Sequence, residues 1–241
     1  CVFSILSQVD AEYEIVITDD SSTSAVRTAV EGWMTLYPQI RYFPGPRSGN
    51  PIENWNAGIE LARGDYVTVV HHDDWFARKD YLNSISSALV DAPSGSCIFA
   101  QATLVGGLRP TRFHLVSKAI AAIGRPLWSL LALNWIGPPS AFVFPNSTAE
   151  RFNEKLRALV DVDFYFRVLQ RRNLIKIEEL SVLSGAHNAQ ITASFNIKTV
   201  SKDELGQIIE KDRCLSSMQV LTLRYLTNLK ILLDFKAITP K

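Results

Sequence analysis

The expected fold follows mainly from one segment, Gly64-Asp-Tyr-Val-Thr-Val-Val-His-His-Asp-Asp-Trp75. Its apolar run, residues 66–70, follows a Gly-Asp turn and ends in two histidines and two aspartates. A run that is apolar on both faces predicts a strand in the middle of a covered parallel sheet, whose ligands bind beyond the carboxyl ends of the strands. Adjacent carboxylates at such an end need a cation or hydrogen-bond donors. Asp73 and Asp74 therefore predict either a Mg²⁺ or Mn²⁺ site or a solvated acidic turn before the next helix.

The composition of the chain is that of an ordinary globular protein. It has 241 residues, of which 47% are hydrophobic and 20% charged, with a formal net charge of +1. This length suits one large domain with or without an appendage, and the near-neutral charge argues against a nucleic-acid partner. The three cysteines are widely spaced without a CxxC pair, so they predict neither a disulfide framework nor a zinc site. Neither a membrane-spanning run nor a signal peptide is visible, and a cytoplasmic setting is expected.

A second acidic pair repeats the pattern of the first. Residues 14–18 form an apolar strand that ends in Asp19-Asp20, and a helix is expected over residues 22–37. A strand at 39–43, a Gly- and Pro-rich loop at 44–51 and a helix at 52–62 follow. This alternation predicts right-handed parallel crossovers. The expected fold is therefore α/β, a Rossmann-like, mostly parallel sheet with helices on both faces and ligands at one edge.

The rhythm changes after Pro93. Strands are expected at 97–105, 140–144 and 175–183, with short apolar helices in 117–133 and C-terminal helices over 200–236. Val160-Asp-Val-Asp163 stands before a helix that runs to about residue 172. Asp163 is expected to be the N-cap or a first-turn acid of this helix. Asp161, two residues before Asp163, is then left for another role.

These stretches resemble the family 2 inverting glycosyltransferases, the nucleotide-diphospho-sugar transferases of the GT-A fold. The resemblance covers residues 1–192 and rests on several motifs in the right order and spacing. These are residues 4–8 with 14–22, Asn54-Trp-Asn-Ala-Gly58, Ala62-Arg-Gly-Asp-Tyr66, His71-His-Asp-Asp-Trp75 and Leu159-Val-Asp-Val-Asp-Phe-Tyr-Phe-Arg167. It implies a GT-A domain over residues 1–195 and a C-terminal helical appendage over 196–241. Because the family's first strand would precede Cys1, a segment upstream of Cys1 is expected.

The resemblance also implies a donor site. Asp20 would accept a hydrogen bond from the nucleotide base, and Asn50 would contact the nucleotide, whereas Asn56 is expected to be structural. Asp73 and Asp74 would serve the ribose and a Mn²⁺ or Mg²⁺ ion that bridges the diphosphate. This metal would act as a Lewis acid and offset the charge that develops on the leaving nucleoside diphosphate.

Further residues have an implied role and a structural alternative. His187 would reach the diphosphate or the metal, or would merely lie at the surface. Trp135 and Ser140 would be walls of the acceptor site, or a buried Trp and part of a stiff connector. His71 stands where many family members have the first Asp of the metal motif, so metal binding would rest on fewer carboxylates.

Asp161 would be the general base that takes a proton from the acceptor hydroxyl as this hydroxyl attacks the anomeric carbon. A single displacement inverts the anomeric configuration. Unlike a glycosidase, the reaction needs no carboxylic acid on the leaving side, because the metal-bound diphosphate leaves readily.

The leading hypothesis is transfer of a sugar from a nucleotide donor, with UDP the expected nucleotide, to a glycan or lipid-linked acceptor in bacterial cell-surface polysaccharide synthesis. One alternative is a sugar-1-phosphate nucleotidyltransferase, which needs a Gly-rich basic loop after the first strand. Another is a degenerate protein that binds nucleotide-sugar or glycan without turnover; His71 favours it and Asp161 opposes it. In the last helix, Arg224, Lys230 and Lys236 alternate with apolar residues. This pattern predicts peripheral contact with the inner face of a membrane, or a helix packed back on the domain.

Overall fold

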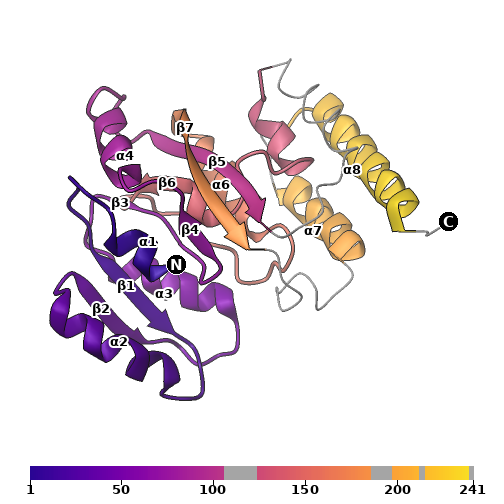
Figure 1. The fold of residues 1–241 in the computed structure, drawn as a ribbon. Coiled ribbons are helices and arrows are strands. Elements are labelled where there is room, and N and C mark those ends of the chain that lie inside the picture. The colour runs from indigo at the N-terminus through magenta and orange to yellow at the C-terminus, as the bar shows by residue number, and fades with distance from the viewer. Residues whose placement is uncertain (106–123, 186–196, 212–214, 239–241) are drawn as a thin grey trace.

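The computed structural model describes residues 1–105, 124–185, 197–211 and 215–238 (Figure 1). Figure 1 shows a small N-terminal layer, a central sheet, and two C-terminal helices on the far side of that sheet. The helices are α1 Val2–Leu6, α2 Ala25–Leu36, α3 Pro51–Leu61, α4 Tyr81–Val90, η1 Leu127–Leu131, η2 Pro139–Ala141, α6 Val160–Leu169, α7 Ile197–Lys211 and α8 Ser217–Ile238. The strands are β1 Ile15–Asp19, β2 Ile40–Pro44, β3 Tyr66–Val67, β4 Asp74–Phe76, β5 Cys97–Val105, β6 Phe142–Pro145 and β7 Leu174–Gly185.

The N-terminal layer is a parallel crossover. β1 and β2 pair in parallel from Ile15 opposite Ile40 to Asp19 opposite Pro44, and α2 connects them. The expected helix at 22–37 and the strands at 14–18 and 39–43 are thus confirmed to within a few residues. At the end of β2 the chain passes very close to β1, because a Cβ at Gly45 would lie 2.4 Å from Asn54 Oδ1 and 3.1 Å from the Asp19 carbonyl. Glycine is therefore required at position 45, where the chain passes beside Asp19.

The central sheet has the strand order β3-β6-β5-β7-β4. Its longest pairing, β5 with β7, is parallel over nine residue pairs, whereas the antiparallel pairings of β3 with β6, β4 with β7 and β5 with β6 extend over only two or three pairs. The two long pairings, β1 with β2 and β5 with β7, are therefore parallel, and the three short pairings are antiparallel. This mixed sheet with helices packed on it confirms the α/β class.

The position of β3 differs from the expectation. Only Tyr66 and Val67 are paired, they are antiparallel to β6, and β3 lies at an edge of the sheet rather than in its middle. The physical reason is that β3 does not pair with β1: a cavity lies between them, and its lining includes Ile15, Ile17 and Val69. A strand upstream of Cys1 stays a prediction.

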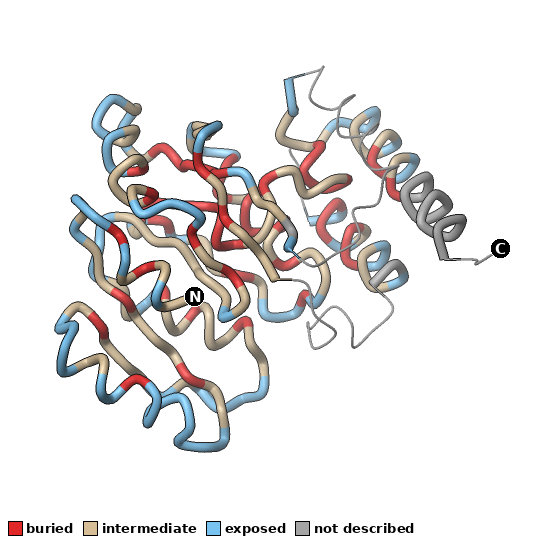
Figure 2. Tube along the Cα trace, viewed as in Figure 1, coloured by how far each residue is buried: buried red, intermediate tan, exposed pale blue. Residues whose placement is uncertain are grey.

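The core continues from the sheet into the C-terminal helices. Figure 2 shows buried residues concentrated in the central sheet, in α6 and on the inner sides of α7 and α8. Leu205 and Ile208 of α7 and Leu223 of α8 belong to the same buried cluster as Phe142 and Phe164. The expected helices over 200–236 are confirmed, and the first half of α8 packs on the domain. The division of domains at residue 195 stays a prediction. Across the described ranges, no helix is long and apolar enough to cross a membrane.

Candidate active site

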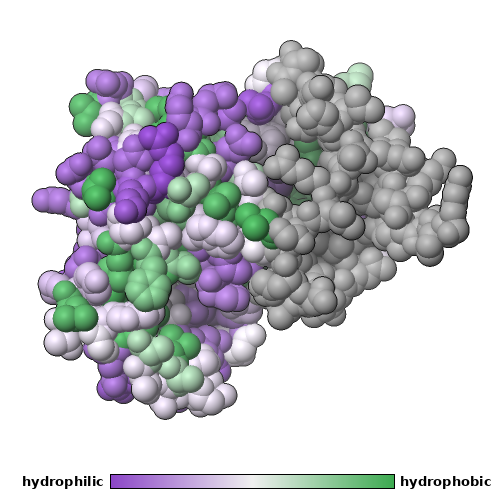
Figure 3. All heavy atoms as spheres, in the orientation of Figure 1, coloured by the Kyte–Doolittle hydropathy of each residue, from purple (hydrophilic) through white to green (hydrophobic). Residues whose placement is uncertain are grey.

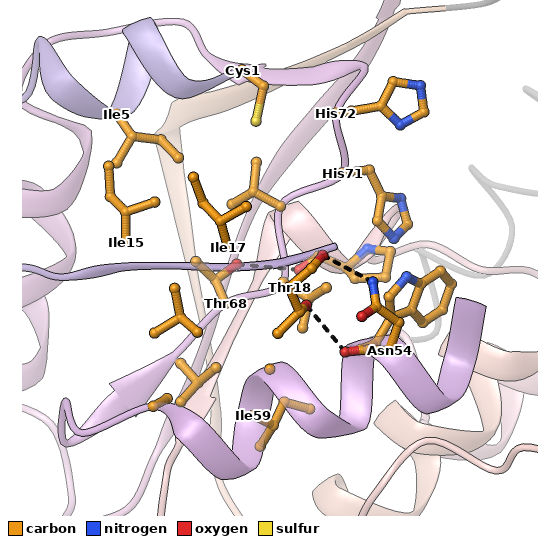
Figure 4. Close-up of a pocket in the computed structure, with 18 of the residues that line it drawn as sticks. Cys1, Ile5, Ile15, Ile17, Thr18, Asn54, Ile59, Thr68, His71 and His72 are labelled. Atoms are coloured by element: carbon orange, nitrogen blue, oxygen red, sulfur yellow. Dashed lines mark hydrogen bonds between the residues drawn. The ribbon is translucent and has the colours of Figure 1, made fainter. Parts of the chain in front are cut away.

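A large cavity brings half of the predicted site residues together. Its volume is about 1650 Å³, and it lies between β1, α3, the segment after β3 and the start of α6. The part shown in Figure 4 is lined by apolar side chains of α1, β1 and α3, with His71 and His72 at its other end. Four predicted residues line the cavity: Asp20, Asn50, Asp73 and Asp161. Asp74, Trp135 and Ser140 are not among the residues that line it, and His187 lies outside the described residues.

Asp20 holds the loop that follows β2. One carboxylate oxygen accepts a hydrogen bond from the Arg47 backbone N–H, and the other accepts from the Gly49 N–H at 3.2 Å. Arg47 and Gly49 have φ values of +56° and +74°, in the left-handed region, and these two bonds help to hold them there. Asp20 thus shapes one wall of the cavity, and its contact with a nucleotide base stays a prediction.

The asparagines of α3 have distinct roles. Asn50 is the N-cap of α3: its side chain accepts from the Ile52 N–H at 3.1 Å and donates to the Glu154 carbonyl at 3.3 Å. Asn56 is buried and exchanges hydrogen bonds of 3.0 and 2.9 Å with the backbone of Phe152, as expected for a structural residue. Contact of Asn50 with a nucleotide stays a prediction.

His71, Asp73 and Asp74 form a cluster that fits a divalent cation. One ligand atom from each residue lies within 4.8 Å of the other two. Asp74 is 1% exposed, and within the described part of the chain neither its Oδ1 nor His71 Nε2 has a hydrogen-bond partner. Buried polar atoms without partners are costly unless something satisfies them. Two carboxylates and one imidazole are suitable ligands for Mn²⁺.

The environment of His71 favours its neutral form, which is the form that binds metals. Burial lowers the pKa of His71, and the opposing effect of the nearby Asp74 and Asp73 carboxylates does not reverse this. Its ring packs on Trp55, with ring centroids 4.7 Å apart. His71 therefore offers a nitrogen at the position where many members of the resembled family have an Asp, whereas the neighbouring His72 side chain is exposed.

The two residues expected to line the acceptor site make internal contacts. Ser140 is fully buried and donates a 2.5 Å hydrogen bond to Asp74 Oδ2. Trp135 donates its indole N–H to Ser129 Oγ at 3.1 Å and packs edge-on against Phe99. These contacts are those of a connector that supports Asp74 and the core. Roles in acceptor binding stay predictions.

Asp161 lies inside α6, not before it. The helix begins at Val160, so Asp161 is its second residue, and the expectation of a later helix start was wrong. Asp163 is a first-turn acid, one of its two expected roles, and not the N-cap: its Oδ2 forms an ion pair with Arg167, one turn along the helix, at 2.8 Å. The helix begins earlier because the Asp163 N–H already donates a helical hydrogen bond to the Leu159 carbonyl at 2.9 Å. Asp161 lines the cavity from the first turn of α6.

Sequence reasoning did not find Asn134, which holds the Asp161 carboxylate. The Asn134 amide donates to Asp161 Oδ2 at 2.8 Å and to the Gly137 carbonyl at 2.9 Å, and its oxygen accepts from the Gly137 N–H at 2.9 Å. Gly137 has φ +106°, and a Cβ there would lie 2.8 Å from that of Ala102. The turn therefore needs glycine. The Trp-Ile-Gly-Pro-Pro pattern was the one sign of this turn in the sequence. Nothing in the sequence linked Asn134 to Asp161.

The profile of the family described as Glycosyl transferase family 2 matches residues 1–173. The chain belongs to this family.

Similar proteins agree with the assignment to this family. The chain is 32% identical over 199 residues to the uncharacterized protein MT1568 of Mycobacterium tuberculosis, covering 76% of this chain and 61% of that protein. Over 74 residues, 31% of this chain and 25% of the relative, it is 32% identical to the glycosyltransferase GlyG of Streptococcus pneumoniae. It thus spans about six tenths of the first relative and a quarter of the second.

Two solved structures have the same fold. Staphylococcus aureus TarS 1–349 in complex with UDP-GlcNAc matches with a TM-score of 0.66 at 15% identity, over 94% of this chain and 66% of that one. The mannosyltransferase PcManGT of Pyrobaculum calidifontis, in complex with GDP-Man and Mn²⁺, matches with a TM-score of 0.65 at 15% identity, over 100% and 71%.

Proposed function

We propose that this protein is a metal-dependent, inverting glycosyltransferase of the hexosyltransferase type, which moves a sugar from a UDP-linked donor to a glycan or lipid-linked acceptor. The observation that carries this proposal is the single cavity lined by Asp20, Asn50, Asp73 and Asp161. These residues come from four separate segments, and each is of the chemical type that the reaction requires. The proposal includes a role in bacterial cell-surface polysaccharide synthesis; both relatives named above are bacterial, and GlyG is described as a glycosyltransferase.

The donor is bound along the wall formed by the two acidic pairs. Asp20 accepts a hydrogen bond from the base, and Asn50 borders the same part of the cavity. Asp73, Asp74 and His71 would hold the cation, Mn²⁺ or Mg²⁺, which when bound supplies positive charge to the leaving diphosphate. The neutral His71 adds a ligand without adding charge repulsion.

Asp161 is the general base. It faces the cavity on the side of α6, and Asn134 holds its Oδ2. It takes the proton from the acceptor hydroxyl as the oxygen of that hydroxyl bonds to the anomeric carbon and the bond from this carbon to the diphosphate breaks. Attack from the side opposite the leaving group inverts the anomeric carbon. Tyr165 beside it stays protonated, since burial, followed by the charges of Asp161 and Asp74, raises its pKa well above the usual range.

Calorimetric titration with UDP and with GDP, each with Mn²⁺ and with EDTA, tests the donor assignment. UDP is expected to bind, with an affinity that Mn²⁺ increases. Tighter binding of GDP than of UDP would show that the donor nucleotide is GDP. Equal affinity for UDP in Mn²⁺ and in EDTA would show that donor binding does not depend on a metal.

Donor turnover separates an enzyme from a degenerate binding protein. A transferase hydrolyses a UDP-sugar slowly when no acceptor is present and faster with Mn²⁺, whereas a degenerate protein binds the donor and leaves it intact. A nucleotidyltransferase would instead release pyrophosphate from UTP and a sugar 1-phosphate.

The proposal places the enzyme in the cytoplasm, at the inner face of the membrane where lipid-linked acceptors would be reached. Met218, Leu221 and Tyr225 on α8 are 72%, 62% and 68% exposed at a spacing of three and four residues, with the exposed Arg224 beside them. This stripe supports peripheral contact. Unchanged co-sedimentation with anionic liposomes in the triple variant Met218→Ser, Leu221→Ser, Tyr225→Ser would rule out this surface.

A further inference from the structure

α7 reaches back to the segment that leads into α6. In Figure 1, α7 lies beside the central sheet with α6, although about 30 residues separate α6 from α7 in the chain. Glu204 of α7 is the residue that makes the connection. Its Oε1 accepts from the Arg157 N–H at 2.6 Å, and its Oε2 accepts from the Ala158 and Leu159 N–H groups at 3.0 and 2.8 Å.

The bonds of Glu204 anchor the segment that leads into α6, a helix without a side-chain cap of its own. The N-cap position of α6 is Leu159, which has no side chain that can accept a hydrogen bond. The three N–H groups directly before the helix are satisfied by one carboxylate from another part of the chain. A negative charge at this end also interacts favourably with the helix dipole. The start of α6 is therefore fixed by α7.

Glu204 is held firmly enough to fix this segment. It is 5% exposed, and its neighbours Leu205 and Ile208 are buried in the same cluster as Val160 and Val162 of α6. A buried carboxylate needs charge-assisted hydrogen bonds, which are stronger than neutral ones. Movement of the 157–159 segment would break all three bonds at once.

We propose that Glu204 is a positioning residue for Asp161, an inference that rests on the proposed function. Asp161 follows the last N–H that Glu204 binds by two residues, in the first turn of α6. Asn134 holds its carboxylate, and Glu204 holds the backbone of residues 157–159, which lead into the helical turn that carries Asp161. A general base must lie within hydrogen-bond reach of the proton it takes, and a misplacement of about 1 Å can slow a reaction by about 100-fold. The C-terminal helices thus take part in transfer without touching the substrate.

Glu204→Gln is the main test, because it keeps the size of the side chain but removes its charge and turns an NH₂ group toward backbone donors. The turnover rate of transfer is expected to fall by about tenfold or more, with UDP affinity unchanged. The matched control is Glu210→Gln on the exposed side of α7, which is expected to transfer at the wild-type rate. Glu204→Asp keeps the charge with a shorter reach and is expected to have an intermediate rate.

Combination with Asp161→Asn separates a positioning role from a general structural one. If Glu204 acts through Asp161, Glu204→Gln leaves the residual transfer of Asp161→Asn unchanged. A further fall by the same factor as in the wild-type background would overturn the proposal, as would a wild-type rate in Glu204→Gln. Near-normal transfer by Asp161→Asn would instead refute the base assignment of the proposed function.

Amide hydrogen exchange gives a readout that needs no activity. The N–H groups of residues 157–159 are expected to exchange faster in Glu204→Gln, while those of β5 keep their wild-type rates. Unchanged exchange at 157–159 would overturn the proposal even if no acceptor is in hand. Should Glu204→Gln not fold, the same measurement on Glu204→Asp decides the question, because the shorter side chain cannot keep all three bonds.

Discussion

The two acidic pairs that follow or begin strands, Asp19-Asp20 and Asp73-Asp74, look alike in sequence and differ in structure. Asp19 is 8% exposed, and both of its oxygens are satisfied, by the Ser21 N–H at 3.0 Å and the Tyr42 hydroxyl at 2.8 Å. Asp74 is 1% exposed, but only its Oδ2 is bonded, to Ser140, and its Oδ1 has no partner in the described ranges.

The difference shows how each pair is neutralised. Adjacent carboxylates need donors or a cation, and the first pair receives donors from the protein itself. In the second pair, Asp74 receives the Ser140 hydroxyl on Oδ2, while its Oδ1 and the Nε2 of His71 have no hydrogen-bond partner in the described ranges. The proposed cation is therefore assigned to Asp73 and Asp74, not to Asp19 and Asp20.

The largest expected effect of this difference is on metal-dependent binding. Asp73→Asn and Asp74→Asn are each expected to lose the increase in UDP affinity that Mn²⁺ produces, and to lower transfer by about 100-fold or more, as expected when a metal ligand is removed. Calorimetry with and without Mn²⁺ measures the first effect and a transfer assay the second. Retention of the Mn²⁺ effect in both variants would show that the cluster is not the metal site.

A smaller effect is expected at the support of the second pair. Ser140→Ala removes the one hydrogen bond to the buried Asp74 Oδ2 and is expected to lower the free energy of unfolding by about 1–3 kcal/mol. The midpoint of urea unfolding measures it. Ser147→Ala in an exposed turn is the matched control and is expected to be neutral. If the two variants are equally stable, bound metal or water already satisfies Asp74.

Asp20→Asn tests whether the first acidic pair acts without the metal. It removes the charge that accepts from Arg47 and Gly49, so the loop is held less firmly, and UDP affinity is expected to fall by about tenfold, which is about 1.4 kcal/mol. Because Asp20 is not a metal ligand, the loss is expected to be the same in Mn²⁺ and in EDTA. A loss confined to Mn²⁺ would make the first pair part of the metal site.

Tyr42→Phe gives the smallest expected effect and has a defined pH dependence. Burial raises the pKa of Asp19, but the hydrogen bonds from Ser21 and Tyr42 outweigh this and hold it below the ordinary value of 3.8. The unfolded state then binds more protons, so this stabilisation is present above pH 3.8 and is lost as the pH falls through the lower folded value. The melting temperature of Tyr42→Phe is expected to be below wild type at neutral pH and to approach it in acid. A difference that persists unchanged at pH 3 would contradict the assignment.

Local sequence predicted the N-terminal half of the fold well. The strands and helices from residue 14 to residue 62 agree with the expectation, because hydrophobic periodicity and Gly or Pro boundaries are local. The edge position of β3 was not predictable, since the same apolar run suits a central strand or a strand beside an apolar cavity. The start of α6 was also missed, because the motif does not reveal that Asp163 pairs with Arg167, and Glu204 lies outside the motif.

The site was predictable in its residue types but not in its supports. Asp20, Asn50, Asp73 and Asp161 line one cavity, as the motifs implied. Asn134 and Glu204 hold Asp161 from 27 and 43 or more residues away, and such long-range hydrogen bonds leave no pattern in a single sequence. Likewise, one member of each acidic pair is buried, Asp19 in the first and Asp74 in the second. Two adjacent aspartates in a motif do not reveal which of them this will be.

Asp161→Asn provides the most direct test of the central claim, that Asp161 is the base in a direct displacement. The substitution keeps the size of the side chain and a hydrogen-bonding oxygen, but the amide cannot take a proton. UDP affinity in Mn²⁺ is expected to stay near wild type, while the rate of transfer falls by about 100-fold or more. Near-normal transfer by this variant would contradict the account, and loss of UDP binding would make Asp161 a donor-site residue instead.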